Sequence, residues 1–166
     1  KAMNEGTYID ENIKDAVPTN FCIGVAGYPE KHFEAPNIEV DIDNLKRKVD
    51  AGADYIITQM FFDNVKYFEF VAKCREKGIT VPIIPGLKPL STTAHLTKLP
   101  ETFSIDIPPE LVRLVNNCKD EKQVYQLGIE WCVAQSKELI AKGAPAIHYY
   151  TMGRGNNITE VIKRVF

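Results

Sequence analysis

Short, almost continuously apolar runs recur along the chain, and each is followed by a polar turn and a stretch with helical periodicity. The runs are rich in β-branched and aromatic residues, which favour strands. Apolar and polar side chains do not alternate within them, and this is the pattern of parallel strands covered on both faces. The runs predict strands over 21–28, 55–62, 81–87 and 146–151.

The stretches between these runs predict helices near 41–51, 64–77, 91–99, 108–117 and 121–142, and a final one in the segment NNITEVIKRVF. Asp41 is expected to be the N-cap of the first helix, with Ile42, Leu45 and Val49 spaced to bury one face. Three helices should end on a glycine in the left-handed conformation, directly before the next strand. These glycines are Gly52, Gly78 and Gly143.

Four βα units in succession predict an α/β fold. They fit either a small open doubly wound sheet or half of a TIM (β/α)₈ barrel, because a complete barrel needs about 250 residues and this chain has 166. The first twenty residues are polar and hold no strand-like run. We therefore expect one domain over 1–166 that is a fragment, with 1–20 as the remnant of a preceding helix or linker.

The composition is that of an ordinary soluble globular protein, with 45% hydrophobic and 25% charged residues. The net charge of −2 gives no reason to expect a nucleic acid or a membrane as partner. No apolar run approaches the roughly 20 residues that span a bilayer, and no signal peptide is visible. We expect a cytoplasmic protein.

The four cysteines are far apart and form no CxxC pair, so we expect neither a disulfide framework nor a zinc site. Cys22 and Cys132 lie in apolar surroundings and are expected in the core. The three histidines show no metal-ligand spacing, and His148, within a predicted strand, is expected to be a hydrogen-bonded core residue.

Polar side chains collect where each predicted strand ends. In both architectures the functional groups gather at the carboxyl ends of the strands, so this regularity indicates a site. The exits carry Tyr28, Glu30 and His32 after the first strand, Gln59 within the end of the second, Lys88, Ser91 and Thr92 after the third, and Tyr150, Thr151 and Arg154 after the fourth.

Each candidate also has a structural interpretation. Gln59 is either an amide bonded to neighbouring backbone or one that reads a flat polar heterocycle by donating and accepting at once. His32 taken singly is an ordinary surface histidine. Lys88 is either solvated or, if burial lowers its pKa, able to form a Schiff base.

The predicted helix after the first strand carries four polar side chains close together. It presents either a solvated face or a polar wall for the sugar and phosphates of a nucleotide. The side chains are Asp41, Asn44, Arg47 and Lys48. No GxGxxG or Walker loop exists in the sequence, so a Rossmann or P-loop site is not supported.

Four segments closely resemble the carboxyl-terminal half of bacterial methylenetetrahydrofolate reductases. They are GVAGYPEKHFEAPN, NLKRKVDAGADYIITQMFFD, VPIIPGLKPL and HYYTMGR, and the resemblance runs from about Phe21 to the end of the chain. It implies a (β/α)₈ barrel that binds FAD at the carboxyl ends of its strands. It also implies that NADH or NADPH reduces the flavin, which then converts 5,10-methylenetetrahydrofolate to 5-methyltetrahydrofolate in one-carbon and methionine metabolism.

The resemblance also implies roles for particular residues. Tyr28, His32 and Ala35 would contact FAD, and the polar helix face of Asp41, Asn44, Arg47 and Lys48 would hold its adenosine and diphosphate. Gln59 would meet the nicotinamide in one half-reaction and the pterin in the other. His95 and Arg154 would contact folate, although His95 stands where some relatives carry a glutamine and Gly153 where an asparagine is common.

The resemblance implies a gap as well. The family's general acid is a glutamate near the end of the first barrel strand, and an aspartate in an RGD segment tunes the flavin. This chain contains neither segment, and Glu30 belongs to a different strand exit. We therefore expect little turnover from the chain alone and self-association into a homo-oligomer through its unpaired sheet edges. A Schiff-base lyase using Lys88 and a non-catalytic flavin- or folate-binding module remain the alternatives.

Overall fold

A computed structural model describes residues 1–7, 12, 15–153 and 155–166. The strands are β1 (Gly24–Gly27), β2 (Tyr55–Met60), β3 (Ile83–Leu87) and β4 (His148–Tyr149). The helices are α1 (Ile38–Asp50), α2 (Asn64–Glu76), α3 (His95–Phe103), α4 (Pro109–Asn116), α5 (Glu121–Ala141) and α6 (Asn156–Val165), and a short 3₁₀ turn, η1 (Ala2–Glu5), comes first. The predicted order of elements is confirmed, although each strand is shorter than its apolar run.

The four strands form one sheet in the order β1-β2-β3-β4, and every neighbouring pair is parallel. A doubly wound sheet reverses its strand order at a switch point, whereas the strands of a (β/α)₈ barrel follow one another around the sheet. The sequential order therefore decides between the two architectures left open by the sequence. The chain is about half of a (β/α)₈ barrel.

The two faces of the sheet differ in how they are covered. Val25, Ile56 and Ile83 point to the helical side and join a core with residues of α1, α2, α5 and α6. On the opposite face Ala26 is exposed and Ile57 is half-buried. The prediction of strands covered on both faces is thus wrong for this chain. The apolar pattern has a second cause, because this opposite face is the one that lies inside a closed barrel.

The pairing of β2 with β3 is irregular next to a proline. The register of this pair shifts between Ile57 and Met60 of β2. The shift lies opposite Pro85 of β3, which has no N–H to donate to the neighbouring strand. The following N–H, of Gly86, donates instead to Oγ1 of the fully buried Thr58 at 2.9 Å. Glycine is needed at 86 because a Cβ there would lie 2.3 Å from the Thr58 carbonyl oxygen.

The ends of the helices confirm one sequence prediction and correct another. Gly52, Gly78 and Gly143 all have positive φ, as expected for residues that terminate helices before strands. Asp41, however, is not an N-cap: α1 begins three residues earlier, and the side chain of Asn37 accepts the capping hydrogen bond from the Val40 N–H. The Asp41 carboxylate is therefore left for another partner.

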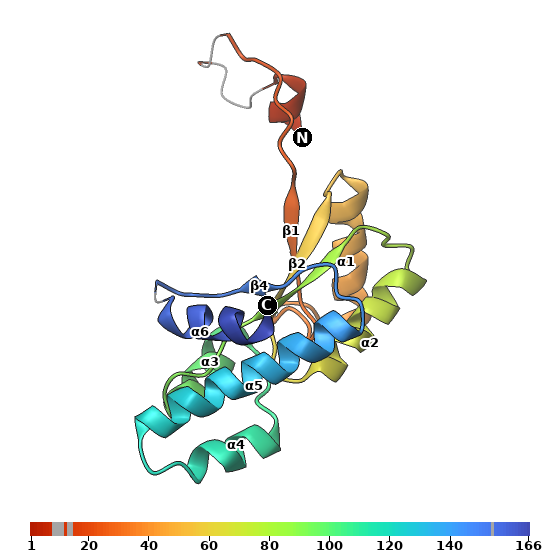
Figure 1. Cartoon of the computed structure of the whole chain (residues 1–166). Helices are drawn as coiled ribbons and strands as arrows, with labels where there is room; N and C mark the ends of the chain where they lie inside the picture. Colours follow the sequence, from red (N-terminus) through yellow and green to blue (C-terminus); the bar gives the residue numbers. More distant parts are fainter. Residues whose placement is uncertain (8–11, 13–14, 154) are drawn as a thin grey trace.

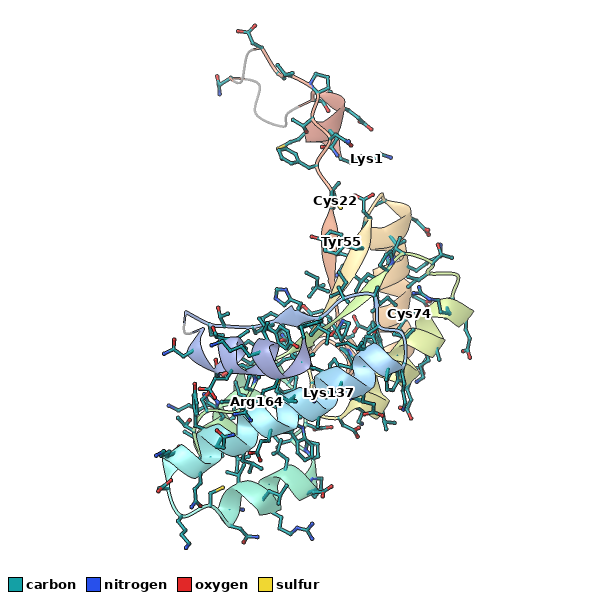
Figure 2. All side chains as sticks on the ribbon, in the orientation of Figure 1. Lys1, Cys22, Tyr55, Cys74, Lys137 and Arg164 are labelled. Carbon is teal, nitrogen blue, oxygen red and sulfur yellow. The ribbon has the colours of Figure 1, made fainter. Side chains whose placement is uncertain are left out.

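The N-terminal segment extends away from the helices, as Figure 1 shows. It contains η1, in which no residue is buried, and the side chain of Asn4 bonds both the N–H and the carbonyl of Phe21. Cys22, labelled in Figure 2, lies on this arm and is exposed, so its predicted place in the core is wrong. Cys132 is buried as predicted.

His148 also departs from its prediction. It lies on the short strand β4, is half-buried, and packs its ring edge-on against Tyr150 at 4.6 Å between centroids. The position faces the uncovered side of the sheet rather than the core, because Tyr149 takes the helical side and bonds Ser136 of α5.

Gly128, in α5, should tolerate no larger side chain. A Cβ at this position would lie 2.0 Å from the carbonyl oxygen of Leu90, and backbone cannot move aside cheaply. We expect Gly128→Ala to lower the free energy of unfolding by about 1–3 kcal/mol or more, measured by urea denaturation. Gly155→Ala, where no atom lies within 4 Å of the added Cβ, is the control and should cost less than about 1 kcal/mol. Equal losses for the two variants would contradict this account.

Candidate functional site

The loop after β1 is fixed to the start of α1. The rings of Tyr28 and His32 meet edge to face at 4.6 Å between centroids, and the His32 N–H donates to Oδ2 of Asp41 at 2.9 Å. Lys31, at a φ of 83°, donates from Nζ to the Ala35 carbonyl oxygen at 2.6 Å. These contacts bring four predicted residues, Tyr28, His32, Ala35 and Asp41, into one corner of the molecule.

The Asp41 carboxylate gives this corner its charge. Burial raises the pKa of the Tyr28 phenol, and the negative charge of Asp41 raises it further. Tyr28 is therefore a neutral hydroxyl near pH 7, able to donate and to accept a hydrogen bond. Because Asp41 does not cap α1, its carboxylate is available to accept the His32 N–H and so to hold the loop.

The remaining polar residues of α1 continue from this corner along the helix. Arg47 donates from its guanidinium to Oδ1 of Asn44, and Arg47 and Lys48 are both exposed. The two cations stand next to one another in the last turns of α1. They are available to a polyanion that extends from the β1 corner over the helix.

Gln59 lies beside the same corner. It lines a narrow crevice together with Tyr28, Glu30, Phe103 and Ile105. Its Oε1 accepts from the Met60 N–H at 2.9 Å, and among the residues that the structure describes Nε2 has no hydrogen-bond partner. The amide is therefore satisfied by backbone at its oxygen, while its donor has no partner among the described residues.

Glu30 is a residue whose environment the sequence did not reveal. Its Oε2 accepts from the Asp106 N–H at 3.0 Å, in the segment between α3 and α4. Burial raises its pKa to about 7, an effect that outweighs the opposing influence of this hydrogen bond. No local signal predicts this, because Asp106 is 76 residues away along the chain.

A second cavity, of about 360 Å³, opens at the exits of β3 and β4. Lys88 lines it and is only 7% exposed. Burial lowers the pKa of Lys88, as the Schiff-base alternative requires. His95 lines the same cavity, and burial together with the charge of Lys88 lowers its pKa as well.

The wall of this second cavity is built by contacts between distant segments. His95 Nδ1 accepts from the Ser91 N–H at 3.1 Å, and Asn157 of α6 donates to Ser91 Oγ at 3.0 Å. This places His95 apart from the Gln59 crevice, in a separate cavity. Arg154 lies outside the described residues.

Tyr150 links the two parts of the site. Its hydroxyl donates to the Thr58 carbonyl oxygen at 2.9 Å, so the exit of β4 is tied to β2 across β3. Burial raises the pKa of Tyr150, and Tyr28 adds a smaller electrostatic contribution. The exit of the last strand is thus held against the second strand of the sheet.

Metal clusters and membrane-spanning helices are absent from the part of the chain that the structure describes. Within the described residues, no group of three or more His, Cys, Asp or Glu side chains is placed to hold a metal ion. No helix in the same part of the chain is both long and apolar enough to cross a membrane.

The sheet order and the polar strand exits define the class of protein: about half of a (β/α)₈ barrel with its candidate site at the carboxyl ends of the strands. A family model described as "Methylenetetrahydrofolate reductase" matches residues 7–165. The chain therefore belongs to the methylenetetrahydrofolate reductase family.

Several curated proteins are similar to most of the chain. A probable methylenetetrahydrofolate reductase (NADPH) of Caenorhabditis elegans is 39% identical over 153 residues, which are 91% of this chain and 23% of that protein. The 5,10-methylenetetrahydrofolate reductase of Escherichia coli is 38% identical over 136 residues, 81% of this chain and 46% of that protein. The chain thus spans less than half the length of either relative.

A solved structure is similar in fold. It is an uncharacterized protein from Clostridium thermocellum, described as binding two copies of 5-methyl-5,6,7,8-tetrahydrofolic acid. Its TM-score is 0.58 at 22% identity, over 86% of this chain and 51% of that one. The likeness supports the α/β barrel-type fold.

The raised pKa of Glu30 predicts a pH dependence of stability. Between its ordinary pKa of 4.5 and the folded value of about 7, the folded state binds more protons than the unfolded state, so stability should fall as the pH rises through this window. Glu30→Gln keeps an acceptor for the Asp106 N–H and removes the titration. We expect the stability difference, variant minus wild type, to grow from pH 5 to pH 8 in urea denaturation. A difference independent of pH would show that Glu30 ionises normally.

Proposed function

We propose that the protein to which this chain belongs reduces 5,10-methylenetetrahydrofolate to 5-methyltetrahydrofolate, using FAD and NADH or NADPH. The single observation that carries the proposal is the joined corner of Tyr28, His32 and Asp41 beside the Gln59 crevice, in a chain that belongs to this family. The corner offers hydrogen-bond donors and acceptors, and the adjoining helix offers positive charge.

The residues at the β1 corner and along α1 fit a flavin dinucleotide. Arg47 and Lys48 supply the cations that a diphosphate needs, and Asn44 fixes the Arg47 guanidinium. Asp41 and His32 supply polar groups for a ribose or an amide edge. When bound, FAD supplies the hydride chemistry, and the chain supplies orientation and electrostatics.

Gln59 is proposed to orient the two substrates in turn. Its Nε2 is available for donation to either one, while Oε1 keeps the Met60 N–H. An amide suits two substrates of different structure because it carries no charge that must be desolvated on each exchange. His95 and Arg154 are proposed to contact the folate at the far side of the site.

The chain by itself is proposed to lack the proton donor for folate reduction. Burial raises the pKa of Glu30 to about 7, but its carboxylate is engaged by the Asp106 N–H. The half-exposed inner face of the sheet and its two unpaired edges should favour self-association into a homo-oligomer.

A Schiff-base lyase is the second candidate, because Lys88 is buried and burial lowers its pKa. It requires a carbonyl substrate bound covalently to Lys88. Borohydride reduction in the presence of small aldehydes and keto acids, followed by peptide mass analysis, would detect the adduct.

Removing the positive charge of α1 should weaken the binding of FAD but not of riboflavin. The variant Arg47→Met/Lys48→Met loses both proposed partners of the diphosphate, and we expect at least about tenfold weaker FAD binding by fluorescence titration. Lys77→Met, on a residue paired with Asp43, is the matched control and should bind FAD as the wild type does. If the double variant bound FAD and riboflavin with equally reduced affinity, the lost interaction would not be with the diphosphate.

The isolated chain should bind FAD yet turn over little. We expect NADH–menadione oxidoreductase activity with added FAD to be near background, because the proton donor and half of the flavin site are proposed to lie outside this chain. Turnover comparable to a full-length relative assayed in parallel would contradict that. Absence of FAD binding as well as turnover would count against every flavin-based function for the chain.

A further inference from the structure

We propose that Glu30 is a positioning residue, whose carboxyl holds the segment between α3 and α4 closed over the crevice at Gln59. The gate segment (residues 103–106) leads from the end of α3 toward α4 (Figure 1). Its closure follows from contacts among the described residues. Its effect on substrates rests on the proposed function, in which Gln59 orients both of them.

One hydrogen bond joins the gate segment to the loop after β1. Oε2 of Glu30 accepts from the Asp106 N–H at 3.0 Å, and the two residues are 76 positions apart in the sequence. Among the residues that the structure describes, no second hydrogen bond joins residues 28–35 to residues 103–108. Loss of the Glu30 acceptor therefore removes the polar link between these two parts of the chain.

The rest of the gate segment is held by a turn and by apolar packing. Ser104 ends α3 in the left-handed conformation, with a φ of 52°, which terminates the helix. Ile105 is 5% exposed and belongs to the same apolar cluster as Met60 of β2. Asp106, which follows, is exposed. The segment thus has an apolar anchor at Ile105 and a polar anchor at Asp106, and the polar one depends on the ionisation of Glu30.

The gate segment forms one wall of the crevice, and the loop after β1 forms another. Phe103 and Ile105 line the first wall, Tyr28 and Glu30 line the second, and Gln59 at the exit of β2 lines the same crevice. In the closed arrangement the crevice has no room for a water molecule. The position of the gate segment therefore limits the conformations that are open to the Gln59 side chain.

Titratable groups from three parts of the molecule lie around Glu30. They are Asp106 of the gate segment, Asp63 and Lys66 at the start of α2, and Tyr28 and Lys31 of the loop after β1. Burial is the largest influence and raises the pKa of Glu30 to about 7, whereas the hydrogen bond from the Asp106 N–H acts in the opposite direction. The negative charges of Asp106 and Asp63 also raise this pKa, and the positive charge of Lys66 lowers it. The net effect favours a neutral Glu30 while the gate is closed.

The gate should open more readily as the pH rises. Opening exposes the Glu30 carboxyl to water, which returns its pKa toward the ordinary value of 4.5. Between 4.5 and about 7 the closed state therefore binds more protons than the open state, so closure weakens through this window. A protonated carboxyl still has an oxygen that accepts the Asp106 N–H, so the closed contact persists at low pH.

Hydrogen exchange of the Asp106 amide measures gate opening without any substrate. In the wild type we expect its protection factor to fall at least about tenfold from pH 5 to pH 8. Glu30→Gln keeps an acceptor but does not titrate, so its protection factor should change much less with pH. Glu30→Ala should lose most of the protection at both pH values. Glu101→Gln, on an exposed glutamate of α3, is the matched control and should behave as the wild type does.

A second amide separates gate opening from unfolding of the whole chain. The Gly86 N–H is bonded to the buried Thr58, so its exchange reports the opening of the sheet. In the wild type it should be protected at least about tenfold more strongly than the Asp106 amide. Equal protection of the two amides at every pH would show that the segment opens only when the chain unfolds, and would overturn the gate.

The effect on substrates is measured in the full-length protein that contains this chain. Because the gate segment limits Gln59, Glu30→Ala should lower kcat/KM for the reduction of 5,10-methylenetetrahydrofolate at least about tenfold. Glu30→Gln should restore most of the loss, and Glu101→Gln should show none. Glu30→Ala and Gln59→Ala together should cost no more than Gln59→Ala alone, since Glu30 acts through Gln59.

The outcomes separate the gate from the proposed function. A Glu30-dependent Asp106 amide in a protein that does not reduce 5,10-methylenetetrahydrofolate would keep the gate and reject the function. Turnover in a protein whose Asp106 amide is equally protected in wild type and Glu30→Ala would reject the gate and keep the function. Additive losses from Glu30→Ala and Gln59→Ala would show that Glu30 does not act through Gln59 and would overturn its positioning role.

Discussion

The carboxyl ends of three strands are held together by one buried threonine. Thr58 receives the Gly86 N–H on its side chain and the Tyr150 hydroxyl on its carbonyl oxygen. Pro85 makes this arrangement necessary, because it cannot donate to β2 and the register shifts beside it. Gln59 follows Thr58 directly, Lys88 lies two residues after Gly86, and Tyr150 makes one of the two bonds, so all three are positioned from this point.

The constraint at Thr58 also explains why the site divides into two parts. On one side of the shifted register lie Gln59 and the corner after β1, where backbone contacts and the Asp41 carboxylate fix the loop. On the other side lies the cavity around Lys88, whose wall depends on the hydrogen bond from Asn157 to Ser91. A long, flat substrate would have to cross the shifted register to reach both parts.

The fold was largely predictable from the sequence because apolar runs and helix-ending glycines are local signals. The repeating pattern alone left a barrel and a doubly wound sheet open, since strand order is a long-range property; the family resemblance implied the barrel, and the strand order confirms it. Asp41 shows how a local rule fails: Asn37 provides a competing cap three residues earlier, and the carboxylate is then used by His32. The corner after β1 could be identified from sequence by resemblance, while the environments of Glu30 and Lys88 depend on segments far away in the chain.

Burial raises the pKa of Glu30 and lowers the pKa of Lys88, and both shifts favour the neutral form of the side chain. The pKa of the Glu30 carboxyl is about 7, and that of the Lys88 ammonium is below its ordinary value. For each residue, burial therefore makes the charged form less favourable. The difference lies in their partners: Glu30 has the Asp106 N–H, whereas the described residues offer Lys88 none. The hydrogen bond of Glu30 holds the segment between α3 and α4 against the loop after β1, whereas no described residue bonds the Lys88 ammonium in this way.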